Sequence, residues 1–183
     1  MNTPTLKKIT LNIKTGRLYG ICGKVGSGKS SFLEAVMGEL PFYSGKVQTK
    51  GKAVYCEQHP TIFAGTIREN IVFGRQFEED RYRKVVNSSA LEEDFQLLEF
   101  GDETMVGEKG ATLSGGQRAR ICLARTLYSE ADIYIFDDPL SAVNSKVASQ
   151  IFKGIQACLE GKTILVSTHI THFLEECDHI IFF

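Results

Sequence analysis

A glycine-rich stretch near the N-terminus, Gly23-Lys-Val-Gly-Ser-Gly28-Lys29-Ser30, constrains the fold more than any other part of the chain. It matches the pattern G-x-x-x-x-G-K-S and lies between a short apolar run, 17–22, and a segment expected to be helical over 28–38. Glycines let backbone N–H groups close around phosphate oxygens, and the positive end of the following helix points at the same anion. The pattern therefore predicts a strand, a phosphate-binding loop (a P-loop, or Walker A motif) and a helix, in that order.

The side chains of this loop have separate expected roles in binding Mg-ATP. Lys29 would place a positive charge between the β- and γ-phosphates, and the Ser30 hydroxyl is a hard oxygen ligand suited to Mg²⁺. The alternative is a glycine-rich turn that binds nothing, but the fixed positions and their context make that coincidence rare. The residues expected around the ATP phosphates are Gly23, Gly26, Ser27, Gly28, Lys29, Ser30 and Ser31.

Two adjacent acids follow an apolar stretch, 132–136, that is expected to form a strand. Asp137 can hold Mg²⁺, through water, opposite Ser30, and Asp138 would then lie where a base could orient the water that attacks the γ-phosphate. Paired carboxylates at a strand end are also common as solvated caps. The P-loop upstream favours the metal role for Asp137, whereas the role of Asp138 as base is the more open of the two.

The pentapeptide Leu113-Ser-Gly-Gly-Gln117 predicts a second anion site. Ser114 and Gln117 have the spacing of a capping box, with Gly115 and Gly116 between them. The helix expected over 115–129 would expose free backbone N–H groups at its positive end. One domain cannot readily direct both anion sites at one phosphate. The alternative is an ordinary capped helix with two glycines in its first turn.

This pentapeptide resembles the LSGGQ signature of the ATP-binding cassette (ABC) superfamily, and the resemblance covers nearly the whole chain. It implies that Ser114, Gly115, Gly116 and Gln117 serve ATP held by the P-loop of a partner domain. Gln58 is similar to the Q-loop glutamine, which implies a catalytic role and a place in the Mg²⁺ ligand set with Ser30 and Asp137. His169 is similar to the switch histidine that contacts the γ-phosphate.

Three longer stretches are most similar to the multidrug-resistance-associated (C) subfamily, which also contains the cystic fibrosis channel. They are 65–74, 111–120 and 137–143, and the last is similar to the first of the two nucleotide-binding domains in that subfamily. Residues 104–110 resemble the X-loop of exporters, and 141–144 resemble the D-loop. The resemblance implies a second nucleotide-binding domain and transmembrane domains as partners, at the cytoplasmic face of a membrane.

The alternation of strands and helices predicts an α/β fold. We expect a P-loop NTPase (RecA-like) core with a parallel sheet, antiparallel strands at the N-terminus and an inserted α-helical subdomain. The chain would be a single domain, 1–183, truncated at both ends, with core residues 1–58 and 130–183 and helical residues 59–129. Strands are expected at 5–13 and 46–48, among others, and none between 59 and 129.

Composition excludes several other classes of protein. A net charge of −1 over 183 residues does not suit nucleic-acid binding. No apolar run approaches the roughly 18 residues of a membrane span, so insertion of this segment into the membrane is not expected. Five cysteines without a C-x-x-C pair suit reduced thiols better than disulfides or a zinc site.

Departures from the family pattern leave three hypotheses open. Hydrolytic members of the family have glutamate at the position of Asp138 and aspartate at the position of Asn144. In this chain, no aromatic residue that could stack on adenine precedes Tyr19. The leading hypothesis is the motor domain of an exporter, with a weak hydrolytic site of its own. The others are a regulatory module that holds ATP with little turnover, and a soluble ABC ATPase acting on DNA or ribosomes. The exporter-like segment and the near-neutral charge count against the last.

Overall fold

The computed structural model describes residues 6–41, 44–108 and 111–183, and their contacts divide the chain into two units. The first unit combines Met1–Tyr55, Ala131–Asp138 and Gly161–Phe183, and the second combines Cys56–Glu130 with Pro139–Glu160. Among the described residues, no helix is both long enough and apolar enough to cross a membrane.

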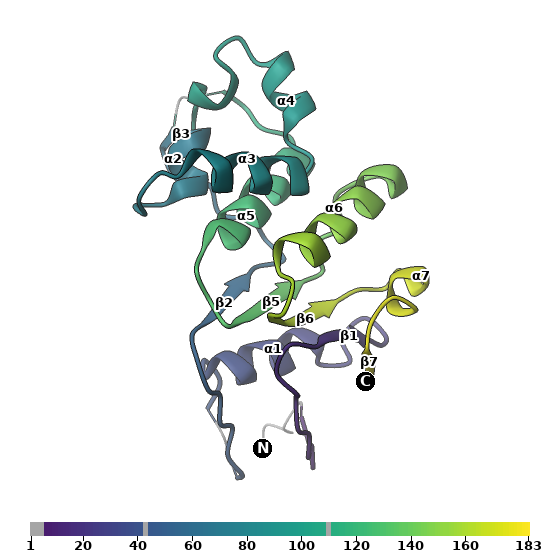
Figure 1. Ribbon diagram of the computed structural model, residues 1–183. Helices are drawn as coiled ribbons and strands as arrows, with labels where there is room; N and C mark the ends of the chain where they lie inside the picture. Colours follow the sequence, from purple (N-terminus) through teal and green to yellow (C-terminus); the bar gives the residue numbers. More distant parts are fainter. Residues whose placement is uncertain (1–5, 42–43, 109–110) are drawn as a thin grey trace. The chain divides into compact units, whose positions relative to one another are not determined.

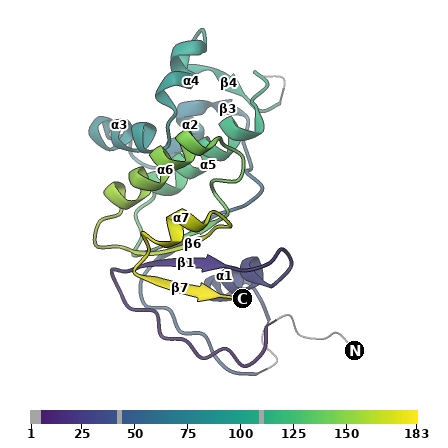
Figure 2. The same ribbon diagram turned by 90° about the vertical axis from the view of Figure 1, so that its right-hand side faces the viewer.

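The first unit is built on a five-stranded sheet with the order β2-β5-β6-β1-β7. Its strands are β1 (Leu18–Cys22), β2 (Ala53–Cys56), β5 (Ile133–Asp137), β6 (Thr163–Ser167) and β7 (His179–Phe182). β1 runs parallel to β6 and β7, and β5 runs parallel to β6; Figure 2 shows β7 alongside β1. Central strands of a parallel sheet are apolar on both faces. Ile21, Ile135 and Leu165 share one face and have no exposed surface. Phe136 and Val166 lie on the other face and are also buried.

The register of this sheet places the ends of three strands at one edge. Ser167, the last residue of β6, is paired with Asp137 at the end of β5 and with Ile21 near the end of β1. The loop that follows β1 leads into α1 (Lys29–Met37), whose Phe32 and Leu33 pack into the core of the sheet. A short helix, α7 (Thr171–Leu174), follows β6. Loops at the carboxyl ends of parallel strands are where α/β proteins bind ligands.

The second unit is mainly helical. Its helices are α2 (Ile67–Val72), α3 (Glu79–Ser88), α4 (Glu92–Leu97), α5 (Gly115–Tyr128) and α6 (Ser145–Cys158), with a 3₁₀ turn, η1 (Gly101–Glu103). α5 contacts α2 and α3, and α3 contacts α6 (Figure 1). The α3–α6 approach is close, because a Cβ on Gly154 would lie 2.5 Å from the carbonyl oxygen of Ser88. β3 (Gly65–Thr66) and β4 (Met105–Val106) form an antiparallel pair.

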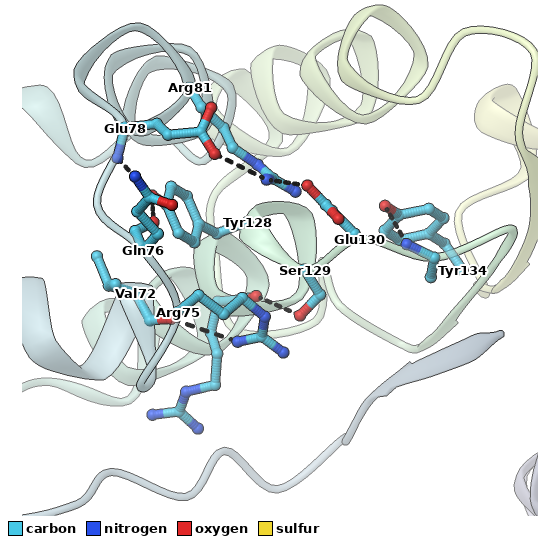
Figure 3. A network of polar contacts seen from close by, with 11 residues as sticks. Val72, Arg75, Gln76, Glu78, Arg81, Tyr128, Ser129, Glu130 and Tyr134 are labelled. Carbon is cyan, nitrogen blue, oxygen red and sulfur yellow. Dashed lines mark hydrogen bonds and ion pairs between the residues drawn. The ribbon is translucent and has the colours of Figure 1, made fainter.

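A polar network ties the start of α3 to the end of α5 (Figure 3). Tyr128 has no exposed surface, and its hydroxyl donates to the carbonyl oxygen of Gln76 at 2.7 Å and accepts the Glu78 N–H at 2.9 Å. The Arg81 guanidinium lies 4.9 Å from the centre of the Tyr128 ring and 2.9 Å from a carboxylate oxygen of Glu130. A buried tyrosine needs a partner for its hydroxyl, and this network supplies two.

The predicted fold class, an α/β fold with a parallel sheet and antiparallel strands, is confirmed. Two of the expected strands are wrong, because 6–13 and 46–48 contain none; Thr5 lies outside the described residues. Strand propensity alone does not make a strand, which also needs a neighbour to pair with its backbone. An antiparallel pair is found instead at β3–β4, inside the region expected to lack strands. Two-residue strands are too short to show an alternating pattern.

Helix positions agree more closely with the sequence analysis. α1 lies between Gly28 and Gly38 as expected, and α5 begins at Gly115, where the helix over 115–129 was expected. Contacts group α6 with the helical unit, whereas residues 139–160 were expected to belong to the core. Of the segment similar to an X-loop, residues 109 and 110 lie outside the described part.

Candidate nucleotide site

The loop between β1 and α1 has the backbone that a phosphate cradle needs. Gly26 and Gly28 have φ values of 77° and 104°, which residues with a Cβ rarely adopt. Gly28 is the N-cap of α1 and makes no side-chain cap hydrogen bond, so the amides of the first turn are left without a capping side chain. An uncapped helix N-terminus with its dipole directed outward is suited to an anion.

Two side chains of the loop test whether a phosphate fits there. The Lys29 ammonium donates to the carbonyl oxygens of Gly23 and Lys24, both at 3.0 Å, and so lies folded over the loop. The Ser27 hydroxyl oxygen is buried and has no hydrogen-bond partner among the described residues. Buried polar atoms are normally satisfied. A phosphate oxygen could supply the missing partner, and the loop therefore fits the nucleotide expected from its sequence.

Asp137 ends β5 and is almost fully buried, with 3% of its surface exposed. One carboxylate oxygen accepts the Ser167 hydroxyl at 2.6 Å, and the other accepts the Tyr55 hydroxyl at 3.0 Å. Each carboxylate oxygen accepts one of these hydrogen bonds and retains a second lone pair. The Asp137 carboxylate can therefore still accept a hydrogen bond from a water bound to Mg²⁺. Ser30, the other expected Mg²⁺ ligand, lies in the first turn of α1.

Asp138 has a left-handed backbone, with φ of 48°. Its N–H donates to the Ser167 hydroxyl oxygen at 2.7 Å, and one of its carboxylate oxygens lies 3.3 Å from Nδ1 of His169. The pKa of Asp138 is raised, mainly by burial and also by the nearby charge of Asp137. His169 and Lys29 act to lower it. The first unit thus brings together four of the predicted residues: Lys29, Asp137, Asp138 and His169.

The signature segment lies in the second unit and forms the predicted capping box. The Ser114 hydroxyl accepts the Gln117 N–H at 3.1 Å, and the Gln117 side-chain oxygen accepts the Ser114 N–H at 2.9 Å. A Cβ on Gly115 would meet nothing within 4 Å, so the face of this turn is open. A Cβ on Gly116 would lie 2.9 Å from the carbonyl oxygen of Ala142, so glycine is needed for that approach.

Asp94 of α4 supports the same turn. It accepts from the Gln117 side-chain nitrogen at 3.1 Å and pairs with the guanidinium of Arg120. The two contacts of the Gln117 side chain fix which way its amide points, because the nitrogen donates to Asp94 and the oxygen accepts the Ser114 N–H. Two other residues considered in the sequence belong to this unit. Gln58 is exposed after β2, and Asn144 caps α6 by accepting the Val147 N–H at 3.0 Å.

Three residues that contact the predicted site residues were not found from the sequence: Tyr55, Ser167 and Asp94. Ser167 and Tyr55 bind Asp137 from other strands, and Asp94 binds Gln117 from another helix. A hydroxyl at the end of a strand gives no pattern of its own, and Asp94 stands in an ordinary acidic helix start. Only the position of Ser167, two residues before His169, could have drawn attention to it.

The arrangement of a P-loop, two acids at a strand end and a capped glycine turn agrees with comparison to known proteins. The family model described as ABC transporter matches residues 6–141. The chain belongs to the ABC transporter family. As such, it is an ATP-binding domain of the P-loop ATPase class.

Three relatives carry C-family or multidrug-resistance-associated names. ATP-binding cassette sub-family C member 4 of Mus musculus is 49% identical over 99% of this chain, which covers 14% of that protein. A probable multidrug resistance-associated protein of Drosophila melanogaster is 48% identical over 98% of the chain, covering 13% of its length. ABC transporter C family member 13 of Oryza sativa subsp. indica is 44% identical over 98% of the chain, covering 12%. The chain therefore spans a small part of the relatives it matches.

Proposed function

We propose that this chain is a nucleotide-binding domain that uses Mg-ATP to drive an exporter of the multidrug-resistance-associated type. The observation that supports it best is the group of residues at the end of β5. Asp138 contacts His169 there, and the positive charge of Lys29 acts to lower the pKa of Asp138. The domain would comprise residues 1–183, with a helical part at 59–129 inside an α/β core, and would be most similar to the first of two such domains.

Each residue around the nucleotide has a proposed task. The loop amides, Ser27 of the loop and Ser31 of α1 would hold the phosphates. Lys29 would leave its two carbonyl partners and neutralise the negative charge of the phosphates. Mg²⁺ is held in proteins through one or two carboxylates together with substrate phosphates, and Ser30, Asp137 and Gln58 would supply the protein ligands. The bound ion would stabilise charge on the phosphates; His169 would contact the γ-phosphate, and Asp138 would orient the water.

The signature turn would act on a second domain. Its open face at Gly115 and its neutral capping box leave a helix N-terminus available to the ATP of a partner nucleotide-binding domain. The two domains would close head to tail, and transmembrane domains would couple that closure to transport at the cytoplasmic face of a membrane. The relatives that carry the transporter name support these partners, and no role in nucleic-acid binding is proposed.

A second candidate function is a regulatory ATP-binding module with little turnover, and Asp138 favours it. Its side chain is one methylene shorter than glutamate, which reduces its reach by about 1.5 Å. A base displaced by that distance can lose orders of magnitude in rate. We propose that the domain's own hydrolytic site is weak for this reason.

Phosphate release by the chain alone and by the chain with a partner domain tests both functions. Alone, the chain should hydrolyse ATP slowly or not at all, because its site lacks a partner's signature. With a partner whose own base is disabled, Asp138→Glu should raise turnover about tenfold, equivalent to about 1.4 kcal/mol in the barrier. Asp138→Asn is the matched control and should change turnover little. A large loss in that variant would show that aspartate already serves as an effective base.

A further inference from the structure

The Ser167 hydroxyl joins the two acidic residues at the end of β5. It is fully buried, accepts the Asp138 N–H at 2.7 Å and lies 2.6 Å from a carboxylate oxygen of Asp137. A backbone N–H can only donate, and an ionised carboxylate can only accept. The single hydroxyl proton of Ser167 must therefore point at Asp137. One side chain thus fixes both the backbone of Asp138 and the carboxylate of Asp137.

The Tyr55 hydroxyl holds the same carboxylate from the opposite side. β5 lies between β2 and β6 in the sheet, so Tyr55 of β2 and Ser167 of β6 approach Asp137 from its two neighbouring strands. Tyr55 donates to the second carboxylate oxygen at 3.0 Å. With a donor on each oxygen, the carboxylate cannot rotate without breaking at least one hydrogen bond. Its remaining lone pairs are fixed in direction.

We propose that Tyr55 and Ser167 are positioning residues that orient the Asp137 carboxylate towards Mg²⁺ bound with ATP. The proposal rests on the function proposed above. Hydrogen bonds of this kind to a metal-binding carboxylate raise metal affinity, and their loss typically lowers it 10- to 100-fold. Ser167 has a second task. Its hydrogen bond to the Asp138 N–H holds the left-handed backbone of Asp138, which sets the position of that candidate base's side chain.

The alternative is that these hydroxyls only satisfy a buried carboxylate and so stabilise the fold. The two roles differ in their dependence on the metal. A structural role would change stability and nucleotide binding equally with and without Mg²⁺. A positioning role would change the Mg²⁺ concentration needed for binding and leave metal-free nucleotide binding as it is.

Tyr55→Phe tests the proposal with the smallest change, since it removes one oxygen atom. The Mg²⁺ concentration for half-maximal binding of a fluorescent ATP analogue to the 183-residue chain would be measured by titration, with a parallel measurement in excess EDTA. We expect about a tenfold rise in that concentration and unchanged binding in EDTA. Tyr134→Phe is the matched control. It removes a buried hydroxyl on β5 that accepts the Ala131 N–H at 3.2 Å, and its Mg²⁺ dependence should equal that of the unaltered chain.

Ser167→Ala should raise the Mg²⁺ requirement as well, and by more than Tyr55→Phe, because it also releases the Asp138 N–H. An unchanged Mg²⁺ requirement in Tyr55→Phe, or an equal loss in EDTA, overturns the proposal. Asp137→Asn separates this failure from failure of the proposed function. If that variant loses Mg²⁺ dependence while Tyr55→Phe keeps it, only the positioning role is wrong. If the unaltered chain binds the analogue without any effect of Mg²⁺, the proposed function is wrong too.

Discussion

The N-termini of α1 and α5 are both proposed to meet phosphate, yet they are built differently. Gly28 is the N-cap of α1, and no side-chain cap hydrogen bond is made there among the described residues. α5 begins at Ser114, whose box with Gln117 already uses two of the donors at that end. The first arrangement suits a loop that wraps its own ligand. The second suits a preformed surface that meets a ligand brought by another domain.

A third helix shows what is special about α5. α2 has the same capping box, made by Thr66 and Glu69, in the same unit. There the third helical residue is an acid, and the negative charge that it brings to the helix N-terminus would repel a phosphate. In α5 the corresponding residue is Gln117, which caps the helix equally well and adds no charge. A neutral capping box with an open glycine is therefore the feature that distinguishes a candidate anion site from an ordinary helix start.

The largest effect is expected at the uncapped helix. Lys29→Ala should lower Mg-ATP affinity about 100-fold, because removing a charge-assisted contact to phosphate costs up to roughly 3 kcal/mol and the loop also loses its two lysine contacts. Isothermal calorimetry measures the affinity, and circular dichroism checks the fold. Unchanged affinity in a folded variant would contradict the assignment of the loop.

At the capped helix the expected effect falls on the partner. Ser114→Asp retains a good N-cap residue but adds a negative charge where the partner's phosphate would lie. In a mixed pair of domains, we expect turnover at the partner's P-loop to fall about 30-fold, roughly 2 kcal/mol, while this chain's own ATP affinity stays the same. Thr66→Asp makes the matching change at the start of α2. It should leave the partner's turnover unaltered, and an equal loss there would remove the distinction between the two boxes.

The features that could be predicted from the sequence are the local ones. Gly28 and Gly38 marked the two ends of α1, and Ser114 marked a capping box with Gln117, three residues further on. Each depends on residues within one or two turns, so spacing alone reveals it. The strand expected over 46–48 failed because its formation depends on a distant neighbour, which spacing does not show.

The supporting contacts of the candidate site could not be predicted for the same reason. Tyr55 lies 82 residues from Asp137, and Ser167 lies 30 residues from it. Asp94 is 23 residues from Gln117. Only the sheet order and the helix packing bring these pairs together, and no short pattern encodes either. The candidate site residues could thus be proposed from motifs, whereas the contacts that hold them in place could not.

Gln117→Glu sharpens the comparison with α2, because it converts the neutral box of α5 into the acidic box found there. The box should persist, but the new carboxylate would face both the proposed anion site and Asp94. In the unaltered chain, Asp94 accepts a hydrogen bond from the Gln117 side-chain nitrogen. We expect the partner's turnover to fall about tenfold. Phosphate release from the mixed pair measures this, with Asp94→Asn added to relieve the repulsion within the chain. If the double variant regained full turnover, the loss would come from Asp94 and not from the partner's phosphate.

The smallest effects concern stability and ask whether the two boxes are equivalent as caps. Loss of an N-cap side chain costs about 1 kcal/mol, so Ser114→Ala and Thr66→Ala should each lower the free energy of unfolding by about that amount. Both boxes belong to the second unit, so urea unfolding followed by circular dichroism would compare them within one part of the structure. Ser114→Ala should also lower the partner's turnover, whereas Thr66→Ala should not. A stability loss at Thr66 without one at Ser114 would mean that the α5 box does not cap its helix in solution, and that Gln117 is held mainly by Asp94.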